Sequence, residues 1–150
     1  MRADILLADS AQSVNGKAYL LGAGWSVQQG PGPLAVVIFI EVGWDETDRR
    51  IPWQLTLEDA DGSIVNLPGP AGPQPFQIAG EIEAGRAPGA AVGSPLTLPP
   101  LTVNLGPLSI EPGRYQFRLS LDGRSEETWH RTFTRTAPPT TGLAPPMAPG

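Results

Sequence analysis

The feature that most constrains the fold of this chain is a hairpin between Arg114 and Arg135. In its first half, apolar side chains alternate with polar ones, at Tyr115, Phe117, Leu119 and Leu121. A period of two is typical of a strand with one buried and one solvated face. Asp122-Gly123 then provides the residue pair that most readily adopts positive φ in a type I′ turn. The hairpin therefore predicts an all-β protein.

Turns and short apolar segments of the same kind divide the rest of the chain. Asn15-Gly16 predicts a second type I′ hairpin, and Pro112-Gly113 predicts a type II turn before the last hairpin. Further strands are expected at residues 5–11, 17–21, 34–42, 51–57, 63–67, 76–84 and 96–105. Eight or nine strands and no segment of helical period predict an immunoglobulin-like antiparallel β-sandwich with Greek-key connections. A closed barrel is the alternative architecture.

Two of these strands have distinctive sequences. Leu34–Val42 is almost continuously apolar, which indicates a strand buried on both faces or one whose outer face is covered. In segment 96–105, Pro99-Pro100 predicts a kink or a place at a sheet edge, because proline cannot donate a hydrogen bond to a neighbouring strand.

Glycine and proline, 18 of each in 150 residues, mark the loops and a tail. They are concentrated in segments 30–33, 68–75, 85–95 and 137–150. We therefore expect one β-sandwich domain over residues 1–136 and an extended proline-rich tail over residues 137–150. Segment 68–75 is expected to be a long proline loop. The tail is expected either to be disordered or to lie along a partner subunit as an arm.

Composition argues against several classes of function. The net charge is −5, and the only adjacent basic pair, Arg49-Arg50, follows acidic residues, so nucleic acid is not an expected partner. The longest apolar run is too short to span a bilayer, and no classical signal peptide precedes the first strand. These features predict a cytoplasmic or virion location and no membrane partner. The absence of cysteine excludes disulfides, thiolate metal sites and cysteine nucleophiles.

The sequence does not predict an enzyme, because it offers no recognisable set of catalytic residues. His130 is the only histidine, and no Gly-x-Ser-x-Gly element accompanies it. A surface histidine among threonines is the preferred interpretation. The acidic residues of segments 45–48 and 59–62 are too few for the roughly six to eight oxygens that Ca²⁺ requires. No catalytic residue, cofactor or metal ion is therefore expected.

The candidate functional residues are instead candidates for protein contact. Trp44 stands at the start of a loop, where an exposed tryptophan would be a binding hot spot. On the last strand, Arg131 and Arg135 share a face with Trp129 and Phe133. The aliphatic parts of the arginines can lie over the aromatic rings, which indicates a surface of mixed polarity like the rim of a protein interface. The complete set adds the prolines of the tail: Trp44, Trp129, Arg131, Phe133, Arg135, Pro138, Pro139, Pro145 and Pro146.

Several segments carry a family resemblance. They are residues 7–12, 15–17, 20–25, 44–46, 57–62 and 112–115. Together they resemble an uncharacterised family of small, high-GC bacterial and phage-associated proteins with a single β-sandwich-like domain. The resemblance extends to about Thr136 and leaves out the proline tail. It implies the fold but no activity, cofactor or catalytic residue, because the family has none established.

The preferred hypothesis is a non-enzymatic structural or protein-interaction module that binds a protein partner or itself. Its sharpest form is an accessory subunit of a larger assembly, such as a decoration or cement protein of a phage particle, by analogy of fold. The alternative is a carbohydrate-binding or small-ligand-binding β-sandwich that uses Trp25, Trp44 or Trp53. A hydrolase that uses His130 ranks last.

Overall fold

The computed structural model describes residues 1–139, and these form an all-β protein with no α-helix in that range. The prediction of an all-β protein is therefore confirmed. The described residues contain thirteen strands and one 3₁₀ turn, Trp44–Glu46 (η1). The strands are β1 (Arg2–Ala8), β2 (Ser10–Val14), β3 (Lys17–Leu21), β4 (Val27–Gln29), β5 (Leu34–Val42), β6 (Arg49–Glu58), β7 (Asn66–Gly69), β8 (Gly72–Pro75), β9 (Gln77–Ala84), β10 (Leu96–Thr97), β11 (Leu101–Leu105), β12 (Gly113–Leu121) and β13 (His130–Thr136).

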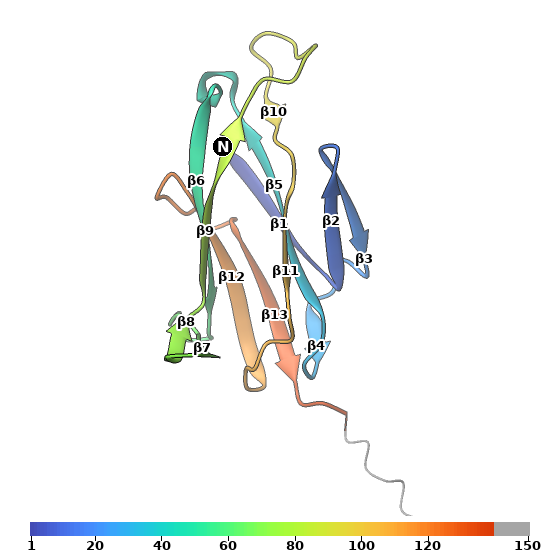
Figure 1. Cartoon of the computed structure of the whole chain (residues 1–150), viewed down its shortest axis with the longest axis vertical. Coiled ribbons are helices and arrows are strands. Elements are labelled where there is room, and N and C mark those ends of the chain that lie inside the picture. The colour runs from blue at the N-terminus through green and yellow to red at the C-terminus, as the bar shows by residue number, and fades with distance from the viewer. Residues whose placement is uncertain (140–150) are drawn as a thin grey trace, which may run out of the picture.

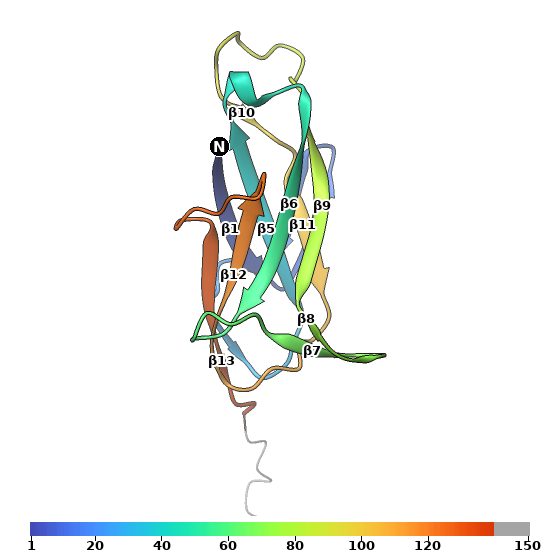
Figure 2. The same cartoon turned by 90° about the vertical axis from the view of Figure 1, so that its left-hand side faces the viewer.

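Two sheets packed face to face form the body of the molecule, as in a β-sandwich (Figure 1, Figure 2). In the first sheet, β5 is central and pairs with β1 on one side and with β10 and β11 on the other. The second sheet has the order β4-β13-β12-β6-β9, with β4 parallel to β13. The two sheets share no strand in the described chain, so the closed barrel is wrong. Two-stranded ribbons β2–β3 and β7–β8 complete the fold, and Figure 2 shows β7–β8 projecting sideways.

The main core lies between the two sheets and contains an aromatic cluster. The buried positions of β12 are those that the period of two predicts: Tyr115, Phe117, Leu119 and Leu121. Phe117 is central, because its ring stacks on Phe133 with 5.6 Å between centroids and meets Phe76 edge-on at 5.9 Å. Burial of such large rings is the main source of stability in a domain of this size.

A second, smaller core lies on the outer face of the first sheet. The outward side chains Ala35 and Val37 of β5 form a buried cluster with Ala8 and Ala11. The β2–β3 ribbon covers this cluster, so β5 is buried on both faces. The expectation for Leu34–Val42 is thus confirmed.

Both predicted type I′ turns are confirmed, but the return strand expected from about Ser125 begins only at His130, which pairs with Arg118. Asn15 and Gly16 have φ values of 51° and 72°, and Asp122 and Gly123 have φ values of 53° and 74°. The twist of such a turn matches the right-handed twist of the strands beside it, so the local sequence is sufficient to predict it.

The structure corrects the predicted number of strands. The described chain has thirteen strands rather than eight or nine, partly because two predicted strands are each divided in the structure. The first predicted strand is divided at Asp9, and segment 96–105 is divided near Pro99-Pro100. Segment 68–75 is not a loop, because most of its residues belong to the β7–β8 ribbon. Two-stranded pairing tolerates proline, since each strand there has a free edge. The three-residue strand β4 has no sequence signal of its own.

The type II turn expected at Pro112-Gly113 is also wrong. Gly113 is the first residue of β12, and its φ lies outside the positive range that such a turn requires. Instead, the Tyr115 hydroxyl donates a hydrogen bond to the carbonyl oxygen of Glu111 (2.7 Å) and fixes the chain before β12. Burial raises the pKa of Tyr115, so the phenol remains protonated and available as a donor.

Candidate interaction surface

The β2–β3 ribbon lies on one side of the molecule, against β5 and β11 (Figure 1). Three of its side chains face the second core: Ala11, Ala18 and Leu20. An isolated two-stranded ribbon is at best marginally stable in water. The ribbon therefore depends on these contacts to keep its conformation.

One side chain fastens the inner edge of the ribbon. Asn104 of β11 accepts a hydrogen bond from the Ala11 N–H (3.1 Å) and donates one to the Ala11 carbonyl oxygen (2.8 Å). A side-chain amide has both a donor and an acceptor, so it can satisfy one backbone residue completely. Asn104 thus replaces the neighbouring strand that β2 lacks on this side.

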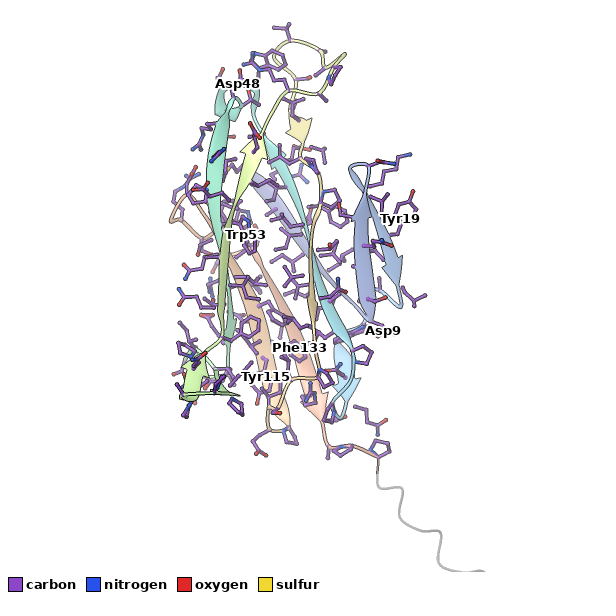
Figure 3. All side chains as sticks on the ribbon, viewed as in Figure 1. Asp9, Tyr19, Asp48, Trp53, Tyr115 and Phe133 are labelled. Carbon is purple, nitrogen blue, oxygen red and sulfur yellow. The ribbon has the colours of Figure 1, made fainter. Side chains whose placement is uncertain are left out.

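The outward face of the ribbon carries an exposed apolar patch, which consists of Val14, Tyr19 and Leu21. These side chains are 37%, 58% and 69% exposed, respectively. Figure 3 shows Tyr19 on the outer side of the ribbon, away from the body of the sandwich. Clustered exposed apolar side chains are typical of protein contact sites, whereas scattered ones are ordinary.

The patch is almost uncharged, although the protein is acidic. Lys17 is the only charged residue from Ser10 to Ile40, in a chain with 10 basic and 15 acidic residues. The patch is not among the contact residues predicted above. Two sequence signals point to it: this long uncharged stretch, and apolar residues at both odd and even positions of Lys17–Leu21.

Three predicted contact residues are buried instead. Trp129, Phe133 and Arg135 are only 2%, 1% and 2% exposed, so they cannot form a surface in this structure. Phe133 and Arg135 share a face as predicted, but that face points into the sandwich. Figure 3 shows Phe133 close to Tyr115, whose ring stacks on it with 5.8 Å between centroids.

Arg135 is buried because neutral groups of the fold accept its hydrogen bonds. Its guanidinium donates to the Leu108 carbonyl oxygen (2.9 Å) and to Gln28 Oε1 (2.6 Å). Its Nε has no acceptor among residues 1–139. Burial lowers the pKa of Arg135, but arginine remains charged in proteins. The side chain joins β13 to β4 and to the segment before β12, which is a structural role.

Arg131 is exposed, as expected for a contact residue, but it also has a structural contact. Its Nε donates a hydrogen bond to the carbonyl oxygen of Ile5 on β1 (2.7 Å). Since β13 and β1 belong to different sheets, this bond links the two layers at their edge.

The prolines of the tail are only partly within the described chain. Pro138 and Pro139 are exposed. Pro138 lies against Gly30, where an added Cβ would be 3.0 Å from the Pro138 Cβ. Pro145 and Pro146 lie outside the described residues, and so does most of the segment 137–150 predicted as a tail.

Trp44 is half-buried, and one face of its ring is covered. The guanidinium carbon of Arg86 lies 3.9 Å from the ring centroid, a cation–π contact. Arg86 also donates to Thr47 Oγ1 (2.8 Å), which fastens the segment after β9 to η1. Trp44 is therefore packed within the molecule rather than presented as a free hot spot.

The other tryptophans proposed for ligand binding are also packed. Trp25 meets Phe133 edge-on, with 6.1 Å between centroids. The Trp53 indole lies over Gly80 of β9, where a Cβ would be 3.0 Å from three indole atoms. The depression beside Trp53 is shallow and open, unlike the clefts that enclose small ligands. These positions give no support to the ligand-binding alternative.

His130 begins β13 opposite Arg118, and its Nδ1 has no hydrogen-bond partner in the described chain. In residues 1–139, no three His, Asp or Glu side chains gather in the manner of a metal site. The same range contains no helix that is long and apolar enough to cross a bilayer.

The outer face of the second sheet is polar and internally paired. Glu58 of β6 accepts hydrogen bonds from Gln116 and from Arg118 Nε on β12, both at 2.9 Å. Burial raises the pKa of Glu58, but these hydrogen bonds outweigh it, so the pKa lies below its usual value. The hydrogen bond from Arg49 likewise lowers the pKa of Asp122. This face contrasts with the apolar patch on the ribbon.

Replacing Glu58 by Gln is expected to make the free energy of unfolding depend less on pH in the acidic range. A lowered pKa in the folded state means that the unfolded state binds the proton more readily. The stabilisation is therefore present above the unfolded pKa of about 4.3 and is lost as the pH falls through the folded pKa. At pH 7, Glu58→Gln should cost about 1 kcal/mol.

Urea unfolding at neutral pH and below the pKa range measures both effects. Glu81→Gln is the matched control, because Glu81 is exposed and its contact with Arg50 is long (3.8 Å). If Glu58→Gln and the wild type lost stability equally on acidification, the assigned role of Glu58 would be wrong.

The geometry and the sequence together define the class of this protein as a β-sandwich-like domain of unknown function. Residues 3–132 match the family described as "Family of unknown function (DUF6941)", and the chain belongs to this family. The resemblance to an uncharacterised family is confirmed in that form. No curated protein matches the sequence.

Proposed function

We propose that this protein is a non-enzymatic interaction module that docks on a protein through the patch of Val14, Tyr19 and Leu21. The observation that carries the proposal is the joint exposure of these side chains on an uncharged ribbon. The outer face of the other sheet offers no comparable surface, because its charged groups pair with one another. Complete burial of an exposed apolar side chain of this size contributes about 1.5–3 kcal/mol. These three are already partly buried, so each contributes a part of that amount to the contact.

A more specific form of the proposal is an accessory subunit of a larger assembly, such as a decoration or cement protein of a phage particle. Its support is analogy: small acidic sandwiches that present a ribbon or an arm suit this role. A cytoplasmic or virion location belongs to the same proposal.

We also propose that the sandwich is immunoglobulin-like, with Greek-key connections. β1, β5 and β11 correspond to strands A, B and E, and β13, β12, β6 and β9 correspond to G, F, C and C′. The hydrogen bond from Tyr115 to Glu111 supports this assignment, since it has the geometry of the tyrosine corner at the start of strand F. An experimental structure with β6 in the sheet of β5 would contradict it.

Site-specific photo-crosslinking in cells that produce the protein tests the interaction proposal. A photoreactive phenylalanine derivative in place of Tyr19 should give a discrete crosslinked product. The same probe in place of Gln77, an exposed position on β9, is the control and should give none.

The product must also depend on the patch. Adding Leu21→Asp, which places a charge in the patch without disturbing a buried side chain, should reduce the yield of product at least tenfold. Equal yields from the probes at positions 19 and 77, or a yield unaffected by Leu21→Asp, would refute docking through the ribbon.

A further inference from the structure

The outer edge of β3 has unpaired backbone groups that are arranged for strand pairing. In a two-residue hairpin, the two residues that flank the turn exchange two backbone hydrogen bonds, and here these residues are Val14 and Lys17. Farther from the turn, residue pairs without and with such hydrogen bonds alternate along the ribbon. The N–H and C=O groups of Ala18 and Leu20 therefore point away from β2. The Asn104 contacts agree with this alternation, because Ala11, the partner of Leu20, directs both backbone groups away from β3.

β3 differs from the other exposed edges in having no protection. Among the described strands, β2 is capped by Asn104, and β4 and β10 are only three and two residues long. β7 contains one proline and β8 two. The edge strand β1 carries Arg2 and Asp4, and its Ile5 carbonyl oxygen accepts a hydrogen bond from Arg131. The long edge strand β9 carries Glu81 and Glu83. Proline, charge and short length are the usual means of preventing edge-to-edge association. β3 has only Lys17, at its first residue.

We propose, as a refinement of the interaction proposal, that β3 pairs antiparallel with β3 of a second copy around a two-fold axis at Tyr19. In this register Ala18 of each copy faces Leu20 of the other. Each of these two facing pairs exchanges two backbone hydrogen bonds, so the edge groups described above are all satisfied. The two Tyr19 residues then form the central non-hydrogen-bonded pair, where cross-strand side chains are closest and aromatic pairs stabilise a sheet.

The charge distribution favours a second copy over a different protein as the occupant. Each copy has a net charge of −5, but the pairing surface contains only Lys17, which lies opposite the uncharged Leu21 of the other copy. No like charges meet in this register. Heterologous partners are commonly selected by complementary charge, and this surface has almost none to offer. In a two-fold symmetric dimer the same surface contacts itself, so it needs no surface of opposite charge on a different protein.

Disulfide trapping tests the pairing directly, because the natural chain contains no cysteine. In the proposed register the two Tyr19 Cα atoms are about 4.5 Å apart, within the disulfide range of about 4.4–6.8 Å. Under mild oxidation, full-length Tyr19→Cys should form a covalent dimer. Lys17→Cys is the matched control on the same face, and its two copies would be about 14 Å apart. We expect at least tenfold more dimer from Tyr19→Cys.

A second variant tests the backbone bonds. Ala18→Pro in the Tyr19→Cys background removes an N–H of the free edge and leaves the β2–β3 bonds in place, so trapping should fall at least tenfold. Failure of Tyr19→Cys to dimerise, or equal dimer from Lys17→Cys, would overturn the proposal. Tyr19 and Lys17 are exposed, so folding does not confound the comparison of their cysteine variants. Ala18 is half-buried against the second core, so a circular dichroism spectrum unchanged by Ala18→Pro is the check that this variant keeps its fold. If the crosslinked product from the probe at position 19 contained only a different protein, the proposed docking through the ribbon would be supported. The proposed pairing of β3 with a second copy would then be refuted.

Discussion

Replacing Phe117 by Ala is expected to lower the free energy of unfolding by about 4 kcal/mol. The side chain is fully buried at the centre of the aromatic cluster, between Phe133 and Phe76. Truncation removes its buried area and leaves a cavity between two rigid sheets that can close only partly. The loss would be a large fraction of the stability of an ordinary domain.

Urea denaturation with tryptophan fluorescence measures this loss. Val92→Ser is the control, because Val92 is 86% exposed in the loop after β9, and it should change the free energy by less than about 0.5 kcal/mol. A loss below about 1.5 kcal/mol for Phe117→Ala would mean that Phe117 is not a core residue.

Asn104→Ala is expected to loosen the β2–β3 ribbon while the sandwich remains folded. The change leaves both backbone groups of Ala11 without their partner, at a cost of about 2 kcal/mol. Because a two-stranded ribbon has little stability of its own, this cost should appear as local opening. Amide exchange of Gln12 and Tyr19, which pair across the ribbon, should accelerate about 30-fold, since about 1.4 kcal/mol corresponds to a factor of ten.

Hydrogen exchange followed by NMR resolves this effect residue by residue. The amides of β12 should keep their protection, and Asn66→Ala, on the exposed start of β7, should change neither region. Acceleration spread equally over ribbon and sandwich would show that Asn104 supports the whole fold rather than the ribbon.

The parts of the fold that the sequence predicts are those that depend on local chemistry. Asn15-Gly16 and Asp122-Gly123 specify their turns because few other residue pairs tolerate two positive φ angles. The apolar character of Leu34–Val42 predicts burial on both faces, although not the ribbon that covers it. The period of two along β12 identifies its inward side chains.

The parts that the sequence does not predict depend on contacts between distant segments. Alternation correctly groups Phe133 with Arg135, but it does not show which face is inward. Arg135 is buried because Leu108 and Gln28, far away in the sequence, supply its acceptors. Nothing local to Trp44 signals that Arg86 would cover its ring.

The interaction patch escapes prediction for a related reason. Tyr19 and Leu21 look like the core side of an alternating strand. They are exposed because Ala18 and Leu20 occupy the inward positions of β3. Which face of β3 is buried depends on how the ribbon packs against β5 and β11, and the sequence of β3 alone does not reveal this.

The parallel contact between β4 and β13 has a mechanical consequence. The N-terminus and the end of the described chain lie toward opposite ends of the sandwich in Figure 1, so tension between them acts along the strands. The chain before β4 would transmit the force to the start of β4, and the chain after β13 would transmit it to the end of β13. In a parallel pair, such opposed forces load all the hydrogen bonds between the strands together rather than one after another. A three-residue strand with no sequence signal would therefore be a main point of resistance to stretching.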